Sequence, residues 1–444
     1  MKISTLKPRT FSHKCTAAVV TLGCKTNQYE SAAMEERLRG AGYDLVDFES
    51  GAELVVVNTC TVTSATDSQS RNLIRRARRF NARARVVVTG CYAQIDPDAL
   101  RAISGVSVVL GNDEKKDFLQ ALEISGEGTQ VRVSDIRQAE KAVPLTLSTF
   151  TERSRAFLQI QNGCDAFCSY CIIPYARGRS RSVLPGDVIS QTRALVEQGF
   201  PEVVLTGIHI GGYGRDLEQP LDLATLTRRL VEESGVTRLR LGSVEPTEIT
   251  EDLIDTVAAS APVCPHVHIP LQSGSDTVLK AMNRHYDTAF FRRLIERIRT
   301  ILPDAAIGID VIAGFPGETS ELFEETRCFI ESLPFTHLHV FPYSRRPGTP
   351  AARMTGQVPG DVARERAGYL RDIGQKKEDA FSRRFIGRTM DVVVEGGTEN
   401  GPRKGVTENY LVVHFPAGDE HVRQAVAVKI EAFSEGRLVG RLAD

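Results

Sequence analysis

The sequence has 444 residues, of which 41% are apolar and 25% are charged, a composition typical of folded globular proteins. This length is long for one domain, so we expect two or three. The formal net charge is −1, so a polyanionic partner would have to be held by local basic patches and not by the overall charge. No apolar stretch has the length of a signal peptide or a membrane span, and we expect a cytoplasmic protein without a membrane partner.

The first part of the chain alternates short apolar runs with segments of helical pattern. The expected strands are 17–22, 54–57 and 85–89, and the expected helices are 27–39, 64–80 and 96–103. This alternation predicts an α/β domain with a doubly wound parallel sheet covered by helices. We assign residues 14–125 to this domain and residues 126–153 to a connector that contains a short strand at 131–133.

Three cysteines of this part, Cys24, Cys60 and Cys91, each follow the end of an expected strand. Because the carboxyl ends of parallel strands share one edge of a sheet, we expect these thiols to converge. Three thiolates without a fourth suit a 4Fe-4S cluster with one open iron. The alternative is three small apolar cysteines packed at strand ends. Cys15, Cys264 and Cys328 show no such pattern, and we interpret them as structural.

A second triplet, Cys164, Cys168 and Cys171, has the spacing C-x3-C-x2-C within one short segment. Three soft ligands again suit a 4Fe-4S cluster whose open iron can bind a substrate, whereas structural zinc normally has four protein ligands. The alternative is a zinc site completed by a histidine. The candidates for that fourth ligand are His209, His266 and His268.

Six strand-helix units surround and follow this loop. The expected strands are 156–160, 202–206, 238–241, 266–269, 307–312 and 337–341. They predict an incomplete barrel over 154–380 with its site at the carboxyl ends of the strands, where the cysteine loop falls. Short strand-like runs at 390–395, 410–415 and 425–430 predict a small β-barrel over 381–444.

The C-x3-C-x2-C loop, with Tyr170 directly before its last cysteine, resembles the signature of radical S-adenosylmethionine (SAM) enzymes. This resemblance implies a partial (β/α)6 barrel, SAM bound to the open iron, and its reductive cleavage to a 5′-deoxyadenosyl radical. It also implies SAM contacts from Tyr170 and from residues at strand ends. The candidates at the strand ends are Gly207, Ser243, Glu245, Gln272 and Asp310.

Motifs around the other triplet narrow the resemblance. Gly23-Cys24-Lys-Thr-Asn-Gln, Asn58-Thr-Cys60-Thr and Gly90-Cys91-Tyr-Ala-Gln resemble the N-terminal domain of methylthiotransferases, and the segment 387–441 resembles the RNA-binding TRAM barrel. Among methylthiotransferases, the residues that this chain has in these motifs look most like those of the branch that acts on N6-threonylcarbamoyladenosine at position 37, next to the tRNA anticodon. Sibling branches, which act on N6-isopentenyladenosine or on a ribosomal protein, remain alternatives, as does a non-catalytic zinc or iron-sulfur RNA-binding protein.

The resemblance implies that a methylthio group is added to C2 of that adenosine. It implies two 4Fe-4S clusters, one for hydrogen abstraction and one for sulfur delivery, and two SAM molecules per turnover. The six cysteines are then both the metal ligands and the catalytic residues. The implied partners are the tRNA anticodon stem-loop, an electron donor such as flavodoxin or ferredoxin, and a sulfur source.

Two basic stretches are candidates for contacts with RNA phosphates. Arg177, Arg179 and Arg181 directly follow the C-x3-C-x2-C loop. The second stretch lies on the expected helix after Cys60 and comprises Arg71, Arg75, Arg76, Arg78 and Arg79. For the second stretch, a solvated helix face is the alternative.

Overall fold

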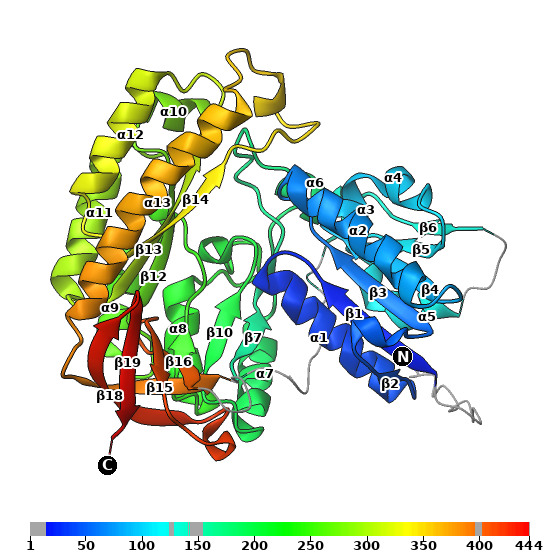
Figure 1. Ribbon diagram of the computed structural model, residues 1–444, viewed down its shortest axis with the longest axis horizontal. Helices are drawn as coiled ribbons and strands as arrows, with labels where there is room; N and C mark the ends of the chain where they lie inside the picture. The colour runs from blue at the N-terminus through cyan, green and yellow to red at the C-terminus, as the bar shows by residue number, and fades with distance from the viewer. Residues whose placement is uncertain (1–14, 124–127, 141, 143–153, 396–401, 444) are drawn as a thin grey trace. The chain divides into compact units, whose positions relative to one another are not determined.

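The computed structural model describes residues 15–123, 128–140, 142, 154–395 and 402–443. Of the expected connector at 126–153, residues 126, 127, 141 and 143–153 lie outside the described residues. The chain divides into two compact units (Figure 1). The first comprises Met1–Thr149, Gly163–Asp165 and Cys171–Arg179, and the second comprises Phe150–Asn162, Ala166–Tyr170 and Ser180–Asp444. Among the described residues, no helix has the length and apolar character needed to cross a membrane.

The first unit contains a six-stranded parallel sheet with the strand order β2-β1-β3-β4-β5-β6. Its strands are β1 (Thr16–Thr21), β2 (Asp44–Leu45), β3 (Leu54–Thr59), β4 (Arg85–Gly90), β5 (Val106–Leu110) and β6 (Gln130–Arg132). Its helices are α1 (Lys25–Gly40), α2 (Ser64–Phe80), α3 (Cys91–Ile95), α4 (Pro97–Arg101), α5 (Phe118–Leu122) and α6 (Ile173–Arg177).

Both faces of this sheet are covered, which confirms the doubly wound architecture. Val55 and Val57 of β3 pack on one face with Ile74 of α2. Val56 points the other way and packs with Met34 of α1. A strand buried on both sides reads as a continuous apolar run, as Leu54–Val57 does.

Three features of this unit differ from the predictions. Strands β2 and β5 were not expected. Strand β6 pairs with β5, so part of the expected connector belongs to the N-terminal sheet. The expected helix at 96–103 is present as the shorter α4, which starts at Pro97 with Asp96 as its cap, and a separate helix that was not expected, α3, precedes it from Cys91.

The second unit contains the six expected strands of a partial (β/α)6 barrel, in two parallel sheets, β7-β10-β11 and β12-β13-β14. Isolated bridges, Leu239 to Val263 and Ser243 to His268, connect the two sheets. The strands are β7 (Ala156–Gln159), β10 (Val203–Thr206), β11 (Leu239–Arg240), β12 (His266–Gln272), β13 (Ala306–Ala313) and β14 (His337–Pro342). Strands β8 (Gln161–Asn162) and β9 (Arg181–Ser182) form a short antiparallel pair.

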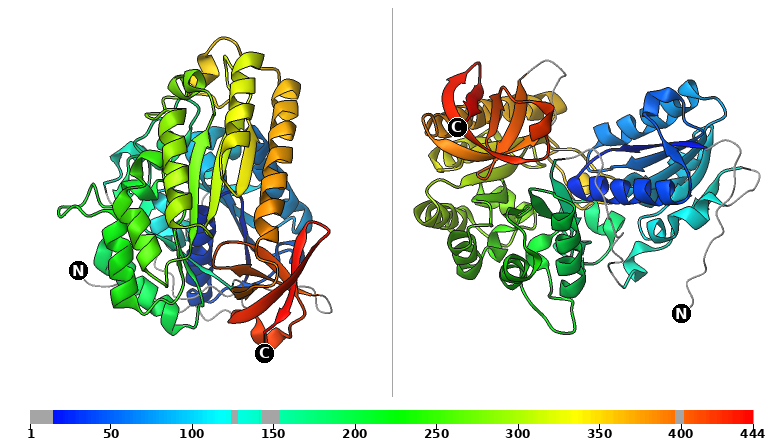
Figure 2. Two further views of the ribbon diagram at one scale, coloured as in Figure 1. Left: turned by 90° about the vertical axis from the view of Figure 1, so that its left-hand side faces the viewer. Right: turned by 90° about the horizontal axis from the view of Figure 1, so that it is seen from below.

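Helices run along the outside of these strands (Figure 2). They are α7 (Pro185–Glu197), α8 (Leu223–Ser234), α9 (Glu251–Ala259), α10 (Asp276–Ala281), α11 (Thr288–Ile301), α12 (Ser320–Ser332) and α13 (Gly360–Arg383). Helix α13 continues three residues past the boundary that we placed at 380. The limits of the domains remain a prediction.

The tail forms a small closed barrel with the strand order β15-β16-β17-β19-β18, as expected for a TRAM-like domain (Figure 2). Its strands are β15 (Thr389–Glu395), β16 (Arg403–Thr407), β17 (Val412–Phe415), β18 (Ala425–Ser434) and β19 (Arg437–Leu442). Three of these strands were predicted, and β16 and β19 were not.

The closed barrel packs against the amino-terminal end of the partial barrel. The ring of Tyr410 lies 4.4 Å from that of His266 and 5.9 Å from that of His337, the first residues of β12 and β14. The guanidinium of Arg240 lies 5.1 Å from the Tyr410 ring centre. The carboxyl ends of the strands, where we expect the site, are therefore at the other end of the partial barrel from this contact.

A buried carboxylate organises this contact. Glu202 accepts hydrogen bonds from Nε of Arg240 at 2.7 Å and from Nη2 of Arg238 at 2.9 Å. The same two arginines also donate to the closed barrel, Arg238 to Asp391 and Arg240 to the carbonyl of Glu408. Burial alone would raise the pKa of Glu202, but the neighbouring arginines outweigh it and lower the pKa to about 2.

Replacing this carboxylate is expected to destabilise the second unit. Glu202→Gln leaves Arg240 buried without a counter-charge and Arg238 with only Asp391, and we expect a loss of about 3–5 kcal/mol in the free energy of unfolding. Urea unfolding followed by circular dichroism measures it. The matched control is Glu251→Gln, because Glu251 pairs with Arg297 at 3.0 Å on the surface, and this change is expected to cost at most about 1 kcal/mol.

The pH dependence gives a second readout of the same prediction. Because the pKa of Glu202 is lower in the folded protein, its contribution is complete above the unfolded value of about 4.3 and is lost as the pH falls towards 2. The difference between wild type and Glu202→Gln should therefore shrink over this acidic range. A control variant as unstable as Glu202→Gln, or a difference independent of pH, contradicts the prediction.

Candidate active site

The cysteines of the N-terminal triplet lie at the ends of three adjacent strands. Cys24 directly precedes α1 after β1, Cys60 follows β3, and Cys91 is the first residue of α3 after β4. Strands β1, β3 and β4 are neighbours in the sheet. A Cβ atom added at Gly23, whose φ is +100°, would lie 2.8 Å from Cβ of Cys60. The turn that carries Cys24 therefore lies against Cys60, as convergence requires.

These thiols influence one another. Burial, together with the nearby thiols of Cys91 and Cys24, raises the pKa of the Cys60 thiol to about 11. A metal centre would remove this penalty, because its ligands are thiolates whose charge the metal compensates. Three converging sulfur ligands, two of them buried, fit an iron-sulfur cluster by donor type and placement.

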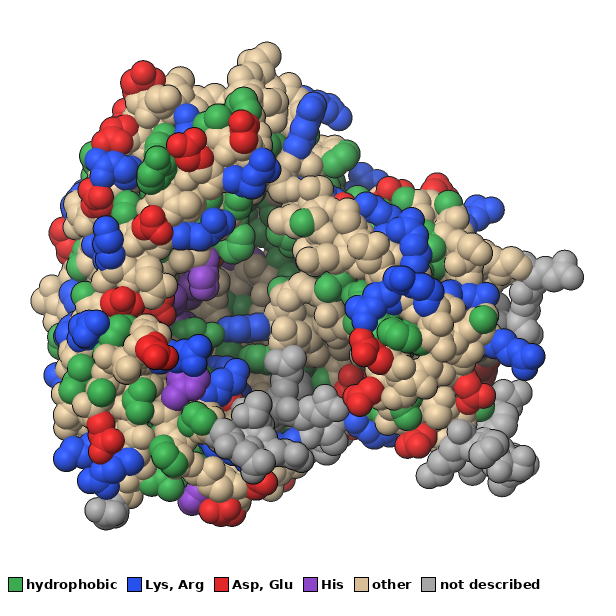
Figure 3. All heavy atoms as spheres, in the orientation of Figure 1, with side chains coloured by type: hydrophobic (Ala, Val, Ile, Leu, Met, Phe, Trp, Pro, Cys, Tyr) green, Lys and Arg blue, Asp and Glu red, His purple; other side chains and the backbone are tan. Residues whose placement is uncertain are grey.

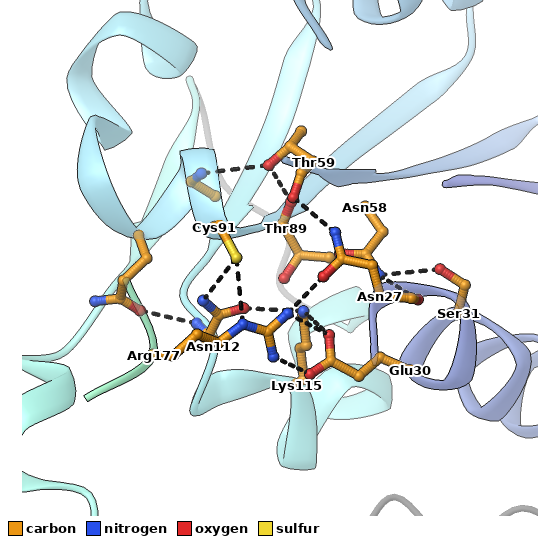
Figure 4. Close-up of polar contacts among 12 residues, drawn as sticks. Asn27, Glu30, Ser31, Asn58, Thr59, Thr89, Cys91, Asn112, Lys115 and Arg177 are labelled. Atoms are coloured by element: carbon orange, nitrogen blue, oxygen red, sulfur yellow. Dashed lines mark hydrogen bonds and ion pairs between the residues drawn. The ribbon is translucent and has the colours of Figure 1, made fainter. Parts of the chain in front are cut away.

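One of these cysteines lies beside a buried polar network (Figure 4). Arg177 donates from Nε to Sγ of Cys91 at 3.2 Å and forms an ion pair with Glu30. Arg177 is fully buried, which corrects our prediction that its guanidinium contacts RNA phosphates. Arg181 is also buried, with 5% of its surface exposed, and that prediction is wrong for the same reason.

The basic residues of α2 lie at the surface of the first unit, where Lys and Arg side chains gather over this helix (Figure 3). Arg75 and Arg79 are exposed, as is Arg179 after the second cysteine triplet. Partly buried members also make contacts within the protein: Arg71 donates to the hydroxyl of Tyr92. In the same way, Arg76 pairs with Glu49 and Arg78 donates to the carbonyl of Ala84.

The C-x3-C-x2-C loop is shaped by a glycine at its start. Gly163 has φ +77°, and a Cβ atom there would lie 1.8 Å from the carbonyl oxygen of Arg179. The amide of Cys164 donates to the carbonyl of Gly178 at 3.1 Å. Tyr170 packs against the apolar cluster that includes Met282. The aromatic residue thus supports the loop by packing, and its contact with SAM remains a prediction.

Cys168 accepts a hydrogen bond from an arginine that the sequence did not single out. Arg284 donates from Nη1 to Sγ of Cys168 at 3.2 Å and is ion-paired with Glu245. It also donates to the carbonyl of Pro270 near the end of β12. Glu245, expected at the SAM pocket, therefore positions a cation next to a cysteine of the expected cluster.

Other expected SAM contacts lie at or near the carboxyl ends of the strands. Gly207 follows β10, and a Cβ atom there would lie 2.7 Å from Ile210 and 2.8 Å from the carbonyl of Gln161. Gln272 ends β12 with φ +71°, a strained conformation for a residue other than glycine. Strain of this kind is typical of functional sites, which supports the prediction for Gln272 without testing it.

Two further candidates meet at a histidine-carboxylate cluster. Oδ1 of Asp310 lies 3.1 Å from Nε2 of His268 and 3.1 Å from Nδ1 of His339. The other ring nitrogen of His268 lies 2.5 Å from Oγ of Ser243. Burial alone would raise the pKa of Asp310, but hydrogen bonds from the two histidines outweigh it and hold the pKa well below its usual value. The cluster places an ionised carboxylate and two imidazoles inside the partial barrel.

The zinc alternative gains no support from the proposed histidines. His209 lies 2.7 Å from Glu248, His268 is engaged by Asp310 and Ser243, and His266 stacks with the ring of His337. Each of these imidazoles therefore contacts at least one group outside the cysteine loop.

Sequence reasoning missed several polar residues of the site, namely Asn27, Glu30, Asn112, Lys115, Arg284 and His339. Asn27 and Glu30 lie within three and six residues of Cys24, so that proximity was the available signal. The others carry no such signal, because their neighbours at the site are distant in sequence.

Comparisons with known proteins agree with this geometry. The model of the uncharacterized protein family UPF0004 matches residues 16–111, and that of the radical SAM superfamily matches residues 158–330. A structure of the radical SAM methyltransferase TsrM from Kitasatospora setae, with cobalamin and a 4Fe-4S cluster bound, has a TM-score of 0.57. It is 19% identical and covers 76% of this chain and 77% of its own, which shows similarity of fold alone.

Similar curated proteins cover nearly the whole chain. The threonylcarbamoyladenosine tRNA methylthiotransferase MtaB of Bacillus subtilis is 41% identical over 97% of both chains. MtaB of Thermotoga maritima is 35% identical, also over 97% of both. The tRNA-2-methylthio-N6-dimethylallyladenosine synthase of Clostridium perfringens is 31% identical over 96% of this chain and 97% of its own. The chain belongs to the family of radical SAM methylthiotransferases that includes the MtaB proteins.

Proposed function

We propose that this enzyme adds a methylthio group to C2 of N6-threonylcarbamoyladenosine at position 37 of tRNA. The observation that carries the proposal is the end-to-end similarity to MtaB, at 41% identity, combined with both cysteine triplets in place. The proteins named for dimethylallyladenosine are 31% identical over a similar length, so the choice of branch depends on this difference and on the motif variants.

The two triplets have different roles in this proposal. Cys164, Cys168 and Cys171 hold one 4Fe-4S cluster, and Cys24, Cys60 and Cys91 hold a second, auxiliary one. When bound, the first cluster would supply an open iron at which SAM is cleaved, and the auxiliary cluster would supply the sulfur that is transferred. Arg284 and Arg177 each donate to one cysteine sulfur of a triplet, so each guanidinium can hold its thiolate in place.

The remaining residues of the site are proposed to bind and orient SAM and the tRNA. Gly207, Ser243, Gln272 and Asp310 are proposed to line the SAM pocket, with Glu245 acting through Arg284. Exposed Arg179, and Arg75 on α2 with Arg71 and Arg78 of the same helix, are proposed to contact tRNA phosphates. The reaction would use two SAM molecules, an electron donor such as flavodoxin or ferredoxin, and a sulfur source, in the cytoplasm.

The substrate is tested by the nucleosides of the tRNA. In a bacterial strain whose own threonylcarbamoyladenosine methylthiotransferase gene is deleted, this chain should restore 2-methylthio-N6-threonylcarbamoyladenosine. Mass spectrometry of digested tRNA measures it, and a Cys168→Ala variant at equal expression should restore none. Restoration of only the isopentenyl derivative in a strain that lacks both activities contradicts the proposed branch and leaves the methylthiotransferase chemistry intact.

A further inference from the structure

Arg177 occupies an unusual position beside the auxiliary cysteines. Its side chain is fully buried within the first unit, and its donors are directed to three groups (Figure 4). Nε donates to Sγ of Cys91 at 3.2 Å, and the terminal nitrogens donate to the carboxylate of Glu30 and to Oδ1 of Asn27. Because the terminal nitrogens of the planar guanidinium are held by these two acceptors, its Nε has one orientation, towards the sulfur.

The charges around this sulfur do not cancel. Lys115, also buried, forms an ion pair with Glu30 and donates to Oδ1 of Asn112 at 2.9 Å. Burial alone would raise the pKa of Glu30, but Arg177 and Lys115 outweigh it and lower the pKa to about 2, so Glu30 is an anion. Two buried cations share one buried anion, which leaves an excess positive charge next to Cys91.

The backbone also fixes this arrangement. Arg177 is the last residue of α6, a helix that begins two residues after Cys171 of the other triplet. The carbonyl of Ala176, its neighbour, accepts a hydrogen bond at 2.7 Å from Asn112, whose Nδ2 lies 4.0 Å from Sγ of Cys91. Helix α6 thus follows Cys171 of one triplet, and its last residue, Arg177, contacts Cys91 of the other triplet.

Hydrogen bonds to the sulfurs and local net charge set the reduction potential of iron-sulfur clusters. A hydrogen-bond donor and a positive charge next to a cluster sulfur stabilise the extra electron of the reduced cluster. We propose that Arg177 is a positioning residue of the auxiliary cluster, which holds the Cys91 thiolate and raises the reduction potential of that cluster. This inference rests on the proposed function, because it requires that Cys24, Cys60 and Cys91 bind a cluster.

The test uses the full-length chain with Cys164, Cys168 and Cys171 replaced by alanine, which isolates the auxiliary cluster. In this background, Arg177→Gln is expected to lower the midpoint potential, with at least a tenfold change in the reduction equilibrium, or about 59 mV for a one-electron couple. Arg177→Lys keeps the charge but loses the fork, so a smaller shift in the same direction is expected. Redox titration followed by electron paramagnetic resonance measures both.

A variant that shifts the midpoint potential in the opposite direction distinguishes an electrostatic effect from non-specific disruption of the cluster. Glu30→Gln removes the anion and leaves Arg177, so it is expected to raise the midpoint potential. Arg83→Lys is the matched control, because Arg83 is exposed in the loop before β4, the strand that leads to Cys91, and no shift is expected. Iron and sulfide are measured in every variant to show that the same cluster is being compared.

The outcomes distinguish this inference from the proposed function. Absence of a cluster in the background protein overturns the proposal of an auxiliary cluster. Unchanged potentials in Arg177→Gln and Arg177→Lys with full iron content overturn the inference alone. If Arg177→Gln loses its cluster, the midpoint potentials of Arg177→Lys and Glu30→Gln test the inference instead. Shifts of the same sign in these two variants overturn the role of charge.

Discussion

Replacing Cys164, Cys168 and Cys171 by alanine is expected to remove one of two 4Fe-4S clusters and all cleavage of SAM. Reconstituted without oxygen, the wild-type chain should hold about eight irons and the variant about four, because in the proposed function each triplet supplies the three thiolates of one cluster. Without the first cluster nothing binds and reduces SAM, so formation of 5′-deoxyadenosine should fall to the level of a reaction without protein. Iron analysis and chromatography of the reaction products measure the two quantities.

The control for this variant removes cysteines outside both triplets. Cys15 and Cys328 lie away from the strand ends of the triplets, and Cys328 is exposed on α12. Replacing both by alanine should leave about eight irons and full cleavage. Stoichiometric zinc without sulfide in wild-type protein that was purified without oxygen would refute the iron-sulfur assignment for both triplets.

The sequence was sufficient to place the six candidate cluster cysteines. Cys164, Cys168 and Cys171 are recognisable because all three lie within eight consecutive residues. Cys24, Cys60 and Cys91 are spread over 68 residues, but each follows an apolar run, and parallel strands bring such positions to one edge. The structure adds that β1, β3 and β4 are direct neighbours, which the strand pattern alone did not establish.

The error at Arg177 has a physical origin. An arginine in a basic stretch is usually a surface residue, and nothing local distinguishes Arg177 from exposed Arg179. The partner that permits its burial is Glu30, which lies 147 residues earlier in the chain. Pairing over such a distance depends on the tertiary fold, so local composition does not predict it.

The missed strands have a comparable explanation. Strand β16 begins with Arg403 and Lys404, which look like loop residues, yet Arg403 is buried and paired with Asp419. Strand β5 is a five-residue segment that is apolar except for Ser107, and segments of this length do not distinguish strand from helix by periodicity. In both cases, neighbouring strands decide the conformation.

Replacing Cys24, Cys60 and Cys91 by alanine is expected to separate radical formation from sulfur transfer. This variant keeps the other triplet, so it should still form 5′-deoxyadenosine when it is reduced in the presence of SAM. It should give no methylthiolated tRNA, because no thiolates hold the cluster from which sulfur is transferred. Mass spectrometry of tRNA nucleosides and quantification of 5′-deoxyadenosine in the same reaction measure both.

This second variant is informative because the two triplets predict opposite patterns. The Cys164, Cys168 and Cys171 variant should lose both products, whereas the Cys24, Cys60 and Cys91 variant should lose only the modified nucleoside, and each should retain about four irons. The division of roles is wrong if the Cys24, Cys60 and Cys91 variant retains its cluster and its fold but no longer cleaves SAM. It is equally wrong if that variant still forms 2-methylthio-N6-threonylcarbamoyladenosine, since sulfur would then reach C2 without these cysteines.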